Sequence, residues 1–234
     1  MVSSMKQRTA TGLAEFIGIV DLLHQHAKFV VFRGQSRQQN LLPSIARDDP
    51  TVDTTAIERT MVEQLKLLGA SFPELTQPTT LDLLVVAQHF GLRTRLLDWT
   101  SNPMAALWFA CSGVSADDVF VYALRADDLQ DHNVYASDPF AKARTRVFQP
   151  RLNNQRIVAQ HGWFTLHRYA AGSSKFVPLE KNTQTKKHLS EILIPGDKKA
   201  SMLVALARMG VSSRTLFPDM QGLCTYLNWH GGVV

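Results

Sequence analysis

The 234-residue sequence predicts a single mixed domain of the α+β class. Segments with helical periodicity and short runs of β-branched or aromatic residues follow one another in irregular order, with the strand-like runs concentrated in the second half. A regular doubly wound sheet would require strict alternation of helices and strands, so the irregular order favours α+β. Apolar residues make up 45% of the chain, which is enough for a sizeable core.

The first third of the chain is predicted to hold two helices around one buried strand. Apolar residues at helical spacing predict a helix over residues 11–26, with Thr11 as its N-cap. Residues 29–32 have the β-branched and aromatic content of a buried strand, which we expect to end at Arg33. After an irregular stretch, a second helix is predicted over residues 54–68.

That second helix has the pattern of a scaffold element. Apolar residues at three- and four-residue spacing normally face the core, so the helix should pack through them. The expected core stripe is Ile57, Met61, Leu65 and Leu68, and the side chains expected in solvent are Glu58, Arg59, Glu63 and Lys66.

Polar side chains gather between two apolar helices in the middle of the chain. Residues 81–90 are predicted to form a helix that Gly91 ends, and a short strand over residues 96–97 follows. Asn102 is placed to cap a second helix over residues 104–111. Buried polar groups need partners, which they find in one another or in a ligand. The polar residues at this junction are His89, Arg93, Arg95, Asp98, Trp99, Thr100 and Ser101.

The second half of the chain is predicted to contain most of the strands. Residues 130–156 are poor in apolar periodicity and rich in Asp, Asn and Arg, so a mobile or lid-like excursion is expected there. The expected strands cover residues 118–124, residues 157–166 with a break at Gly162, and residues 189–195. Two helices should follow, one over residues 198–209 that Gly210 caps, and one from Pro218 with Asp219 in its first turn.

The composition indicates a reducing compartment and no membrane contact. The two cysteines, Cys111 and Cys224, lie in apolar or amphipathic segments, so free thiols are expected instead of a disulfide framework. The N-terminal residues lack a signal-type apolar run, and no stretch of about 18 apolar residues is present. We therefore expect a cytoplasmic protein.

The net charge of +5 is compatible with an anionic partner such as a nucleic acid or a dinucleotide. The basic residues are concentrated in two regions, and each region is either a set of solvated loops or an anion-binding surface. One region holds Lys142, Arg144, Arg146, Arg151 and Arg156, and the other holds Lys181, Lys186, Lys187, Lys198 and Lys199.

Arg33 is a candidate anion-binding residue. A cation at the end of a buried strand, followed by Gly34, is suited to contact a phosphate or a carboxylate. The alternative is a salt bridge to Asp98 or another acid, and Arg95 and Asp98 are open to the same structural explanation. His89 would either polarise a substrate or hydrogen-bond a ribose, or be a satisfied residue at a helix end.

The sequence lacks the motifs of several common types of active site. There is no HExxH, CxxC or paired-His pattern, so no metal site is expected. Neither GxxxxGK nor GxGxxG occurs, and no Gly-x-Ser-x-Gly elbow surrounds Ser101. P-loop, Rossmann and serine-hydrolase chemistry therefore have no sequence support.

The sequence resembles the FRG domain family, which is named after the tripeptide found here at residues 32–34. The resemblance implies a domain over residues 28–228, preceded by a helix in residues 1–27 and followed by a tail in residues 229–234. It also implies a bacterial or phage-associated protein in a toxin or phage-defence setting. The matching motifs are HFGLRTRLLDWT at residues 89–100, PMAALWFA at 103–110, Arg156-Ile157 with Gln160, Gly162 and Phe164-Thr165, and Leu216-Phe217-Pro218-Asp219 with Gly222 and Leu223.

A second resemblance is to mono-ADP-ribosyltransferases. That family has an arginine and a glycine at the end of a first strand, a Ser/Thr-rich strand before an apolar helix, and a late strand with a glutamate. The matching residues here are Arg33 and Gly34, Thr100 and Ser101, and Glu191. The implied fold is a split sheet with flanking helices. Arginine would hold the NAD pyrophosphate, the hydroxyls would place the nicotinamide ribose, and the glutamate would stabilise the oxocarbenium-like centre.

The sequence departs from this transferase pattern at two points. Leu189 stands two positions before Glu191, where the family has an acidic residue or a glutamine. The strand before the apolar helix reads Asp-Trp-Thr-Ser in place of Ser-Thr-Ser. Gln160 competes with Glu191 for the catalytic position, and it would leave an amide where a carboxylate is expected.

Together the resemblances imply an ADP-ribosyltransferase-like enzyme that uses NAD to modify a macromolecule, with His89, Arg95 and Asp98 also beside NAD. Nucleic acid is the favoured acceptor because of the basic loop, a protein acceptor is open, and an antitoxin or other protein is a further partner. One alternative is a non-catalytic module that binds a nucleic acid or nucleotide in the same cleft. Another is an interaction domain in which Arg33 and Asp98 only pair.

Overall fold

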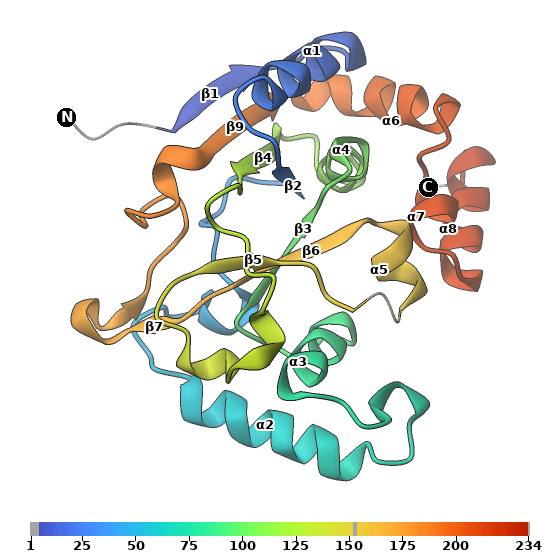
Figure 1. Cartoon of the computed structure of the whole chain (residues 1–234). Helices are drawn as coiled ribbons and strands as arrows, with labels where there is room; N and C mark the ends of the chain where they lie inside the picture. Colours follow the sequence, from blue (N-terminus) through green and yellow to red (C-terminus); the bar gives the residue numbers. More distant parts are fainter. Residues whose placement is uncertain (1–4, 152–153, 234) are drawn as a thin grey trace.

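A computed structural model describes residues 5–151 and 154–233, and it contains one seven-stranded mixed sheet flanked by helices (Figure 1). The strand order is β1-β9-β4-β2-β3-β6-β5. The α+β prediction is confirmed. The strands are β1 (Lys6–Thr9), β2 (Val30–Gln35), β3 (Leu96–Thr100), β4 (Val119–Arg125), β5 (Arg146–Phe148), β6 (Gly162–Leu166) and β9 (Leu189–Ile194), with a separate two-stranded ribbon of β7 (Tyr169–Ala170) and β8 (Lys175–Phe176).

The helices lie in groups around the sheet (Figure 1). Helices α1 and α6 lie together at one end of the molecule in this view, and α2 and α3 lie at the other end. In the part of the chain that the structure describes, no helix is both long and apolar enough to cross a membrane. The helices are α1 (Leu13–His24), α2 (Thr55–Leu68), α3 (Thr80–His89), α4 (Pro103–Cys111), α5 (Gln155–Ala159), α6 (Lys199–Arg208), α7 (Ser213–Leu216) and α8 (Met220–His230).

The sheet consists of two halves that meet at a narrow junction. Strands β2 and β4 are joined by six residue pairs, and β3 and β6 by five. Between β2 and β3 the register contains one pair, Phe32 with Thr100. The two strands therefore diverge on either side of that pair. The halves β1-β9-β4-β2 and β3-β6-β5 form one sheet that is nearly split at its centre.

Each half of the sheet has its own apolar core. Helices α1, α4 and α6 cover one face of the β1-β9-β4-β2 half, and α2 and α3 pack with the β3-β6-β5 half. Burying these side chains supplies the main favourable free energy of folding. The first core includes Phe16, Val20, Phe32, Leu107, Val121, Ile192, Met202 and Leu206, and the second includes Val62, Leu84, Leu96, Phe148, Phe164 and Leu166.

Residues 5–27 pack as part of the same body. Strand β1 pairs in parallel with β9, in the register of Gln7 with Glu191. Helix α1 buries Phe16 and Val20 in the first core. The N-cap of α1 is Gly12, so the prediction of Thr11 as N-cap is wrong. Thr11 instead bonds to Glu15 through its backbone N–H and its hydroxyl.

Local sequence signals set the ends of several helices as expected. The Asn102 side chain accepts hydrogen bonds from the backbone N–H groups of Met104 and Ala105, and Pro103 is the first residue of α4. Gly91 and Gly210 follow α3 and α6 with φ of +90° and +81°, which L-residues rarely adopt. Asp219 is the N-cap of α8, one position before the first turn.

Two strand predictions need correction. Strand β2 does not end at Arg33 but continues to Gln35, because its pairing with β4 extends to Gln35 and Phe120. The predicted double strand over residues 157–166 is half helix. Residues up to Ala159 belong to α5, which the Asn154 side chain caps, and the strand begins only at Gly162.

The prediction of a mobile or lid-like excursion over residues 130–156 is wrong for the described part of that segment. Strand β5 pairs with β6 and forms an edge of the sheet. Val134, Phe140 and Phe148 are buried in the second core. The segment lacks helical or strand periodicity because its apolar anchors are isolated residues between polar turns. Residues 152 and 153 lie outside the described residues.

Helix α2 is rotated relative to the prediction, so that only part of the expected stripe meets the core: Leu65 packs against it, and Met61 is half-buried. Ile57 and Leu68 of the expected core stripe are 58% and 78% exposed, whereas Glu58 is fully buried with Val62. The rotation follows from an ion pair: Glu58 accepts hydrogen bonds from the Arg95 backbone N–H at 2.6 Å and from Arg95 Nε at 2.7 Å. Helical periodicity alone cannot reveal such a pair, since its partner is 37 residues away.

The Glu58–Arg95 pair connects α2 to the start of β3. The Arg95 guanidinium also donates to Thr55 Oγ1 and lies 4.3 Å from the ring centre of Phe140. Burial raises the pKa of Glu58, and the charge and hydrogen bonds of Arg95 offset part of that rise. Each partner would be costly to bury without the other.

We expect Glu58→Ala to destabilise the protein by about 3–5 kcal/mol, because it leaves the Arg95 guanidinium buried and unpaired. Urea unfolding measures the loss. The control Glu63→Ala, on the exposed side of the same helix, should stay within about 0.5 kcal/mol of wild type. The double variant Glu58→Leu/Arg95→Met should recover most of the loss. Equal stability of Glu58→Ala and Glu63→Ala would contradict the structural role of the pair.

Candidate functional site

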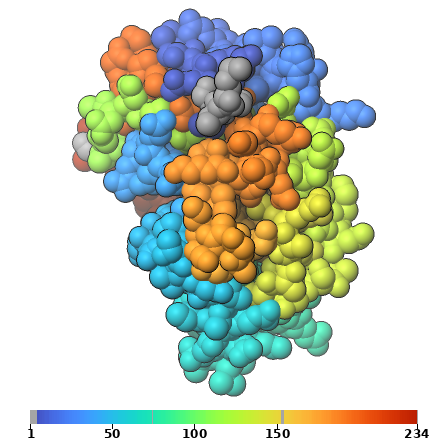
Figure 2. All heavy atoms as spheres, turned by 90° about the vertical axis from the view of Figure 1, so that its left-hand side faces the viewer, coloured from blue at the N-terminus to red at the C-terminus, as the bar shows by residue number. Residues whose placement is uncertain are grey.

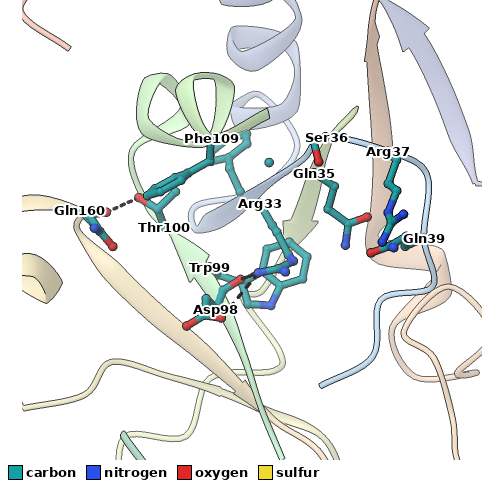
Figure 3. Close-up of a pocket in the computed structure, with 12 residues that line it drawn as sticks. Arg33, Gln35, Ser36, Arg37, Gln39, Asp98, Trp99, Thr100, Phe109 and Gln160 are labelled. Atoms are coloured by element: carbon teal, nitrogen blue, oxygen red, sulfur yellow. Dashed lines mark hydrogen bonds and ion pairs between the residues drawn. The ribbon is translucent and has the colours of Figure 1, made fainter. Parts of the chain in front are cut away.

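A pocket of about 380 Å³ opens where β2 and β3 diverge (Figure 3). Its walls come from the end of β2 and the loop after it, from β3, from α4, and from Gln160 directly after α5. The volume lies within the usual range of small-molecule sites. The lining residues are Phe32, Arg33, Gly34, Gln35, Ser36, Arg37, Gln39, Asp98, Trp99, Thr100, Phe109 and Gln160.

Arg33 is the central cation of this pocket. Its side chain is 17% exposed, and its terminal nitrogen donates to the Asp98 carbonyl at 2.9 Å and lies 3.7 Å from the Asp98 carboxylate. Burial lowers the pKa of Arg33, and the charge of Asp98 opposes that shift. An arginine stays charged at neutral pH even so. Within the described residues, Arg33 Nε and Gln35 Oε1 are buried without a hydrogen-bond partner.

Asp98 is the carboxylate at the pocket rim. Its side chain is 52% exposed and accepts a hydrogen bond from Gln88 Nε2 at 2.9 Å. Gln88 in turn accepts from the Thr94 hydroxyl. The sequence alternative of an Arg33–Asp98 contact is therefore present in the structure. Asp98 neutralises Arg33 from the solvent side, and this contact leaves Nε without a hydrogen-bond partner among the described residues.

Trp99 forms an aromatic wall beneath Arg33 (Figure 3). Its indole nitrogen donates to Thr165 Oγ1 at 3.0 Å, and the Thr165 oxygen lies 3.0 Å from His167 Nε2. Burial, with the charges of Arg95 and Arg33, lowers the pKa of His167 to about 3. The ring is therefore neutral at physiological pH, and its Nε2 can accept from the Thr165 hydroxyl while that oxygen accepts from Trp99.

Gly34 is explained by packing against α4. A Cβ atom at this position would overlap the carbonyl of Ala106 and the backbone nitrogen of Ala110. The glycine lets β2 lie directly on the helix, which brings Phe109 of α4 to the pocket wall. Gly34 thus shapes the pocket through its contact with α4, and its backbone lines the pocket beside Arg33.

Thr100 and Gln160 join three segments at the far wall. The Thr100 hydroxyl donates to the Gln160 carbonyl at 2.6 Å and accepts from the Asn102 backbone N–H. The Gln160 amide donates to the Leu216 carbonyl at 3.0 Å. Arg156 and Asp219 form an ion pair nearby, with Arg156 Nε 2.7 Å from the carboxylate. The late sequence motifs therefore meet in space and close this wall.

Glu191 lies on the same face of the sheet as Arg33 but does not line the described pocket. Arg33 is opposite Tyr122 in the β2–β4 pair, and Tyr122 is opposite Glu191 in the β4–β9 pair, so the three side chains form one row. Glu191 is 2% exposed. It accepts hydrogen bonds from Gln7 Nε2 at 2.8 Å and from Gln38 Nε2 at 3.2 Å.

Tyr122 separates the two charges of this row. Burial and the neighbouring charge of Glu191 raise the pKa of Tyr122 well above its usual range, so the phenol stays protonated. Gln38 belongs to the loop after β2 that also supplies Arg37 and Gln39 to the pocket. This loop therefore lies between Glu191 and the pocket.

The remaining predicted site residues, Arg95, His89 and Ser101, do not line the pocket. Arg95 is committed to Glu58 in the core. His89 lies at the end of α3, where burial and the charge of Arg156 lower its pKa. Ser101 donates its backbone N–H to the His161 carbonyl.

The sequence analysis missed the polar run that follows β2. Residues 35–39 supply Gln35, Ser36, Arg37 and Gln39 to the pocket, and Arg37 and Gln39 pair through their side chains. A signal was present, since a run of polar residues, 35–39, stands at the C-terminal end of a buried strand. Phe109 was missed because it belongs to a helix whose other residues are mostly apolar.

The basic loop predicted from the sequence is largely neutralised by acidic partners. Lys142 pairs with Asp131, and Arg151 pairs with Asp82. Arg156 pairs with Asp219. For metals, the described residues contain no group of three or more His, Cys, Asp or Glu side chains placed to hold an ion.

Comparison with protein families matches the FRG domain to residues 28–119. This part of the chain, which is less than half of its length, is therefore similar to an FRG domain, and it includes β2, β3 and α4 around the pocket. No curated protein and no solved structure matches the chain.

We expect stability to fall with acid through His167. Its folded pKa of about 3 lies below the ordinary value of 6.5, so the unfolded chain binds more protons between these values. Stability is therefore full above about pH 6.5 and is lost as the pH falls, by up to about 1.4 kcal/mol per pH unit.

Urea unfolding at a series of pH values between roughly 7 and 4 measures this dependence. His167→Gln should flatten the slope, and the exposed-site control His132→Gln should follow wild type. Parallel curves for wild type and His167→Gln would show that His167 is not the titrating group.

Proposed function

We propose that the Arg33 pocket binds NAD, as a nucleotide-recognition site of the FRG domain. The observation that carries this proposal is the unpaired buried Nε of Arg33, together with the unpaired Oε1 of Gln35, in a pocket open to a ligand. Buried polar groups without partners are costly. Because both atoms are buried, a ligand that accepts from Arg33 and donates to Gln35 would satisfy both groups after the two side chains turn toward the pocket.

The chemistry of the walls suits a nucleotide. Arginine presents its donors in a planar fork that matches phosphate oxygens, and Arg33 and Arg37 both line the pocket. Trp99 and Phe109 offer flat apolar surfaces against which a ring can pack. The Thr100 hydroxyl is engaged with the Gln160 carbonyl, which suggests that it orders the wall and leaves ligand binding to Arg33 and Gln35.

NAD should raise the unfolding temperature of the wild-type protein and leave Arg33→Ala unshifted. At a free NAD concentration of 100 Kd the stabilisation is about 2.7 kcal/mol, which corresponds to roughly 5–10 °C for a chain of this size. Differential scanning fluorimetry measures the shift. Arg93→Ala, at an exposed arginine that pairs with Asp48, serves as the matched control and should keep the wild-type shift.

AMP and nicotinamide mononucleotide, tested separately, identify which half of NAD the pocket holds. Two results would exclude this pocket as the NAD site. One is that millimolar NAD does not stabilise the wild-type protein, and the other is that Arg33→Ala keeps the full shift of the unfolding temperature.

A second candidate function is transfer of ADP-ribose from NAD to a macromolecule, in a toxin or phage-defence setting. The row of Arg33, Tyr122 and Glu191 on one face of the sheet favours it. Two strand spacings separate Arg33 from Glu191, or about 10 Å. NAD held by its pyrophosphate at Arg33 could then direct its nicotinamide ribose toward Glu191.

Catalysis would require Gln38 to leave Glu191. In transfer, the bond between the ribose carbon and the nicotinamide nitrogen breaks, nicotinamide leaves, and the acceptor bonds to the same carbon and loses a proton. A carboxylate stabilises the positive charge that develops on the ribose. The amide of Gln160 carries no charge and is already bonded to the Leu216 carbonyl, so Glu191 is the better candidate.

We expect Glu191→Gln to abolish transfer of label from NAD to acceptors in a cell extract while NAD still stabilises the variant. Arg33→Ala should lose both transfer and stabilisation, because it lacks the NAD anchor. Gln160→Ala should retain transfer. Label in the nucleic-acid and protein fractions is counted separately. Loss of transfer in Gln160→Ala alone would return Gln160 to the catalytic position, and stabilisation by NAD without any transfer would leave a binding module.

A further inference from the structure

A second hollow, of about 250 Å³, lies at the β1 edge of the sheet and is lined by basic residues. Four segments that are distant in sequence build it: β1, the end of α1, the end of β4 and the residues before β9. Figure 2 faces this side of the molecule, where the dark-blue N-terminal segment lies beside the orange segment that leads into β9. The basic patch is defined here as Lys6, Arg8, Arg125, Lys186 and Lys187.

The basic patch is not neutralised by acidic residues. None of the described residues that line the hollow is Asp or Glu. No patch cation forms an ion pair with any described residue, and the one hydrogen bond that a patch side chain makes to a described residue is from Arg125 to the Lys187 carbonyl at 2.8 Å. This contrasts with the loop around Lys142, in which three cations are paired. The fold therefore concentrates unscreened positive charge here and not where the sequence pattern suggested.

Burial and the positive charge of the patch lower the pKa of a neighbouring histidine. His188 lies beside the patch, and burial together with the charges of Lys187 and Arg125 lowers its pKa, while Asp127 and Asp128 oppose the shift. These two aspartates line the adjoining hollow with His24 and Lys28. They bound the positive surface on that side, so an anion should follow Lys6, Arg8, Lys186 and Lys187.

The basic patch and the Arg33 pocket lie at opposite ends of the strands. Strand β9 runs parallel to β2, since both pair antiparallel with β4. The patch surrounds the start of β9 and the end of β4, which lies opposite the start of β2, whereas the pocket lies at the end of β2. Five steps along β2 separate the two ends, or about 16 Å. The two sites are therefore distinct.

We propose that the basic patch binds the phosphodiester backbone of a nucleic acid. Several lysines and arginines converge on one concave surface, and a chain of phosphates can occupy such a groove with one phosphate per cation. A bilayer presents a plane of headgroups, which would meet a protruding surface better than a hollow. Binding at the patch is independent of the ligand in the Arg33 pocket. The contacts are to the backbone, so little sequence preference is expected.

The test is fluorescence anisotropy of the full chain with labelled 20-mers of single-stranded RNA and duplex DNA at several KCl concentrations. The variant Lys186→Ala/Lys187→Ala removes two patch cations. The control Lys66→Ala/Arg208→Ala removes two exposed cations elsewhere, from α2 and α6, and has the same net charge. Thermal unfolding establishes that both variants fold.

We expect the patch variant to bind at least tenfold more weakly than wild type at the lowest salt, and the control to stay within about twofold. The slope of log K against log salt should become less negative by about 1.8 for duplex DNA or about 1.4 for single strands, since two phosphate contacts are lost. The oligomer that binds with the higher affinity identifies the kind of nucleic acid.

Three outcomes would overturn the proposal. The first is wild-type protein that binds neither oligomer at low salt. The second is equal weakening in the patch variant and the control, which would assign binding to net charge. The third is equally tight, patch-dependent binding to polyglutamate or to phosphatidylserine vesicles, which would make the surface a general or lipid-directed polyanion site.

Discussion

The divergence of β2 from β3 is the constraint on which the candidate site depends. A fully paired β2–β3 ladder would hold the two strands at the usual separation of about 4.8 Å and leave no room for a ligand. Here one residue pair joins them, and the strands separate towards the end where Arg33 and Asp98 lie. Each strand is held from its other side, β2 by β4 and by the close approach of Gly34 to α4, and β3 by β6 and the Glu58–Arg95 pair. The split is therefore stable without a ligand to support it.

In the β1-β9-β4-β2 half of the sheet, a neutral side chain separates two buried side chains of opposite charge. The row begins with the Arg33 guanidinium, continues with the neutral Tyr122 phenol and ends with the Glu191 carboxylate. A buried charge needs compensation by donors or acceptors. Glu191 obtains it from two glutamine amides, whereas Arg33 is compensated only in part, by one carbonyl and a rim carboxylate. Arg33 therefore keeps one donor, Nε, without a partner among the described residues, whereas the Glu191 carboxylate is bonded to Gln7 and Gln38.

Signals local in sequence were sufficient for much of the fold and for part of the site. Asn102, Gly91 and the run of β-branched residues before Arg33 each act on their immediate neighbours, and the predicted helix end, N-cap and strand are present. The mistakes arose where a distant partner decided the outcome. Helix α2 is rotated so that Glu58 can pair with Arg95, which is distant in sequence. The same ion pair holds the Arg95 side chain in the core, away from the pocket. Three of the five cations of the basic loop pair with aspartates, and two of these aspartates, Asp82 and Asp219, are remote in sequence. No pattern in the chain could indicate the pocket role of Phe109.

The two positive sites impose a geometry on any reaction that uses both. A nucleic acid bound at the basic patch begins about 16 Å from the Arg33 end of β2. A duplex rises about 3.4 Å per base pair along its axis, so that distance corresponds to roughly five base pairs. Glu191 and Ser190 are neighbours in β9, so their side chains point to opposite faces of the sheet: Ser190 lines the patch hollow, and Glu191 lies on the face of Arg33. A nucleic acid that reached from the patch to Glu191 would therefore have to pass around an edge or an end of the sheet, so a reaction that used both sites would need an acceptor longer than the distance along the strand.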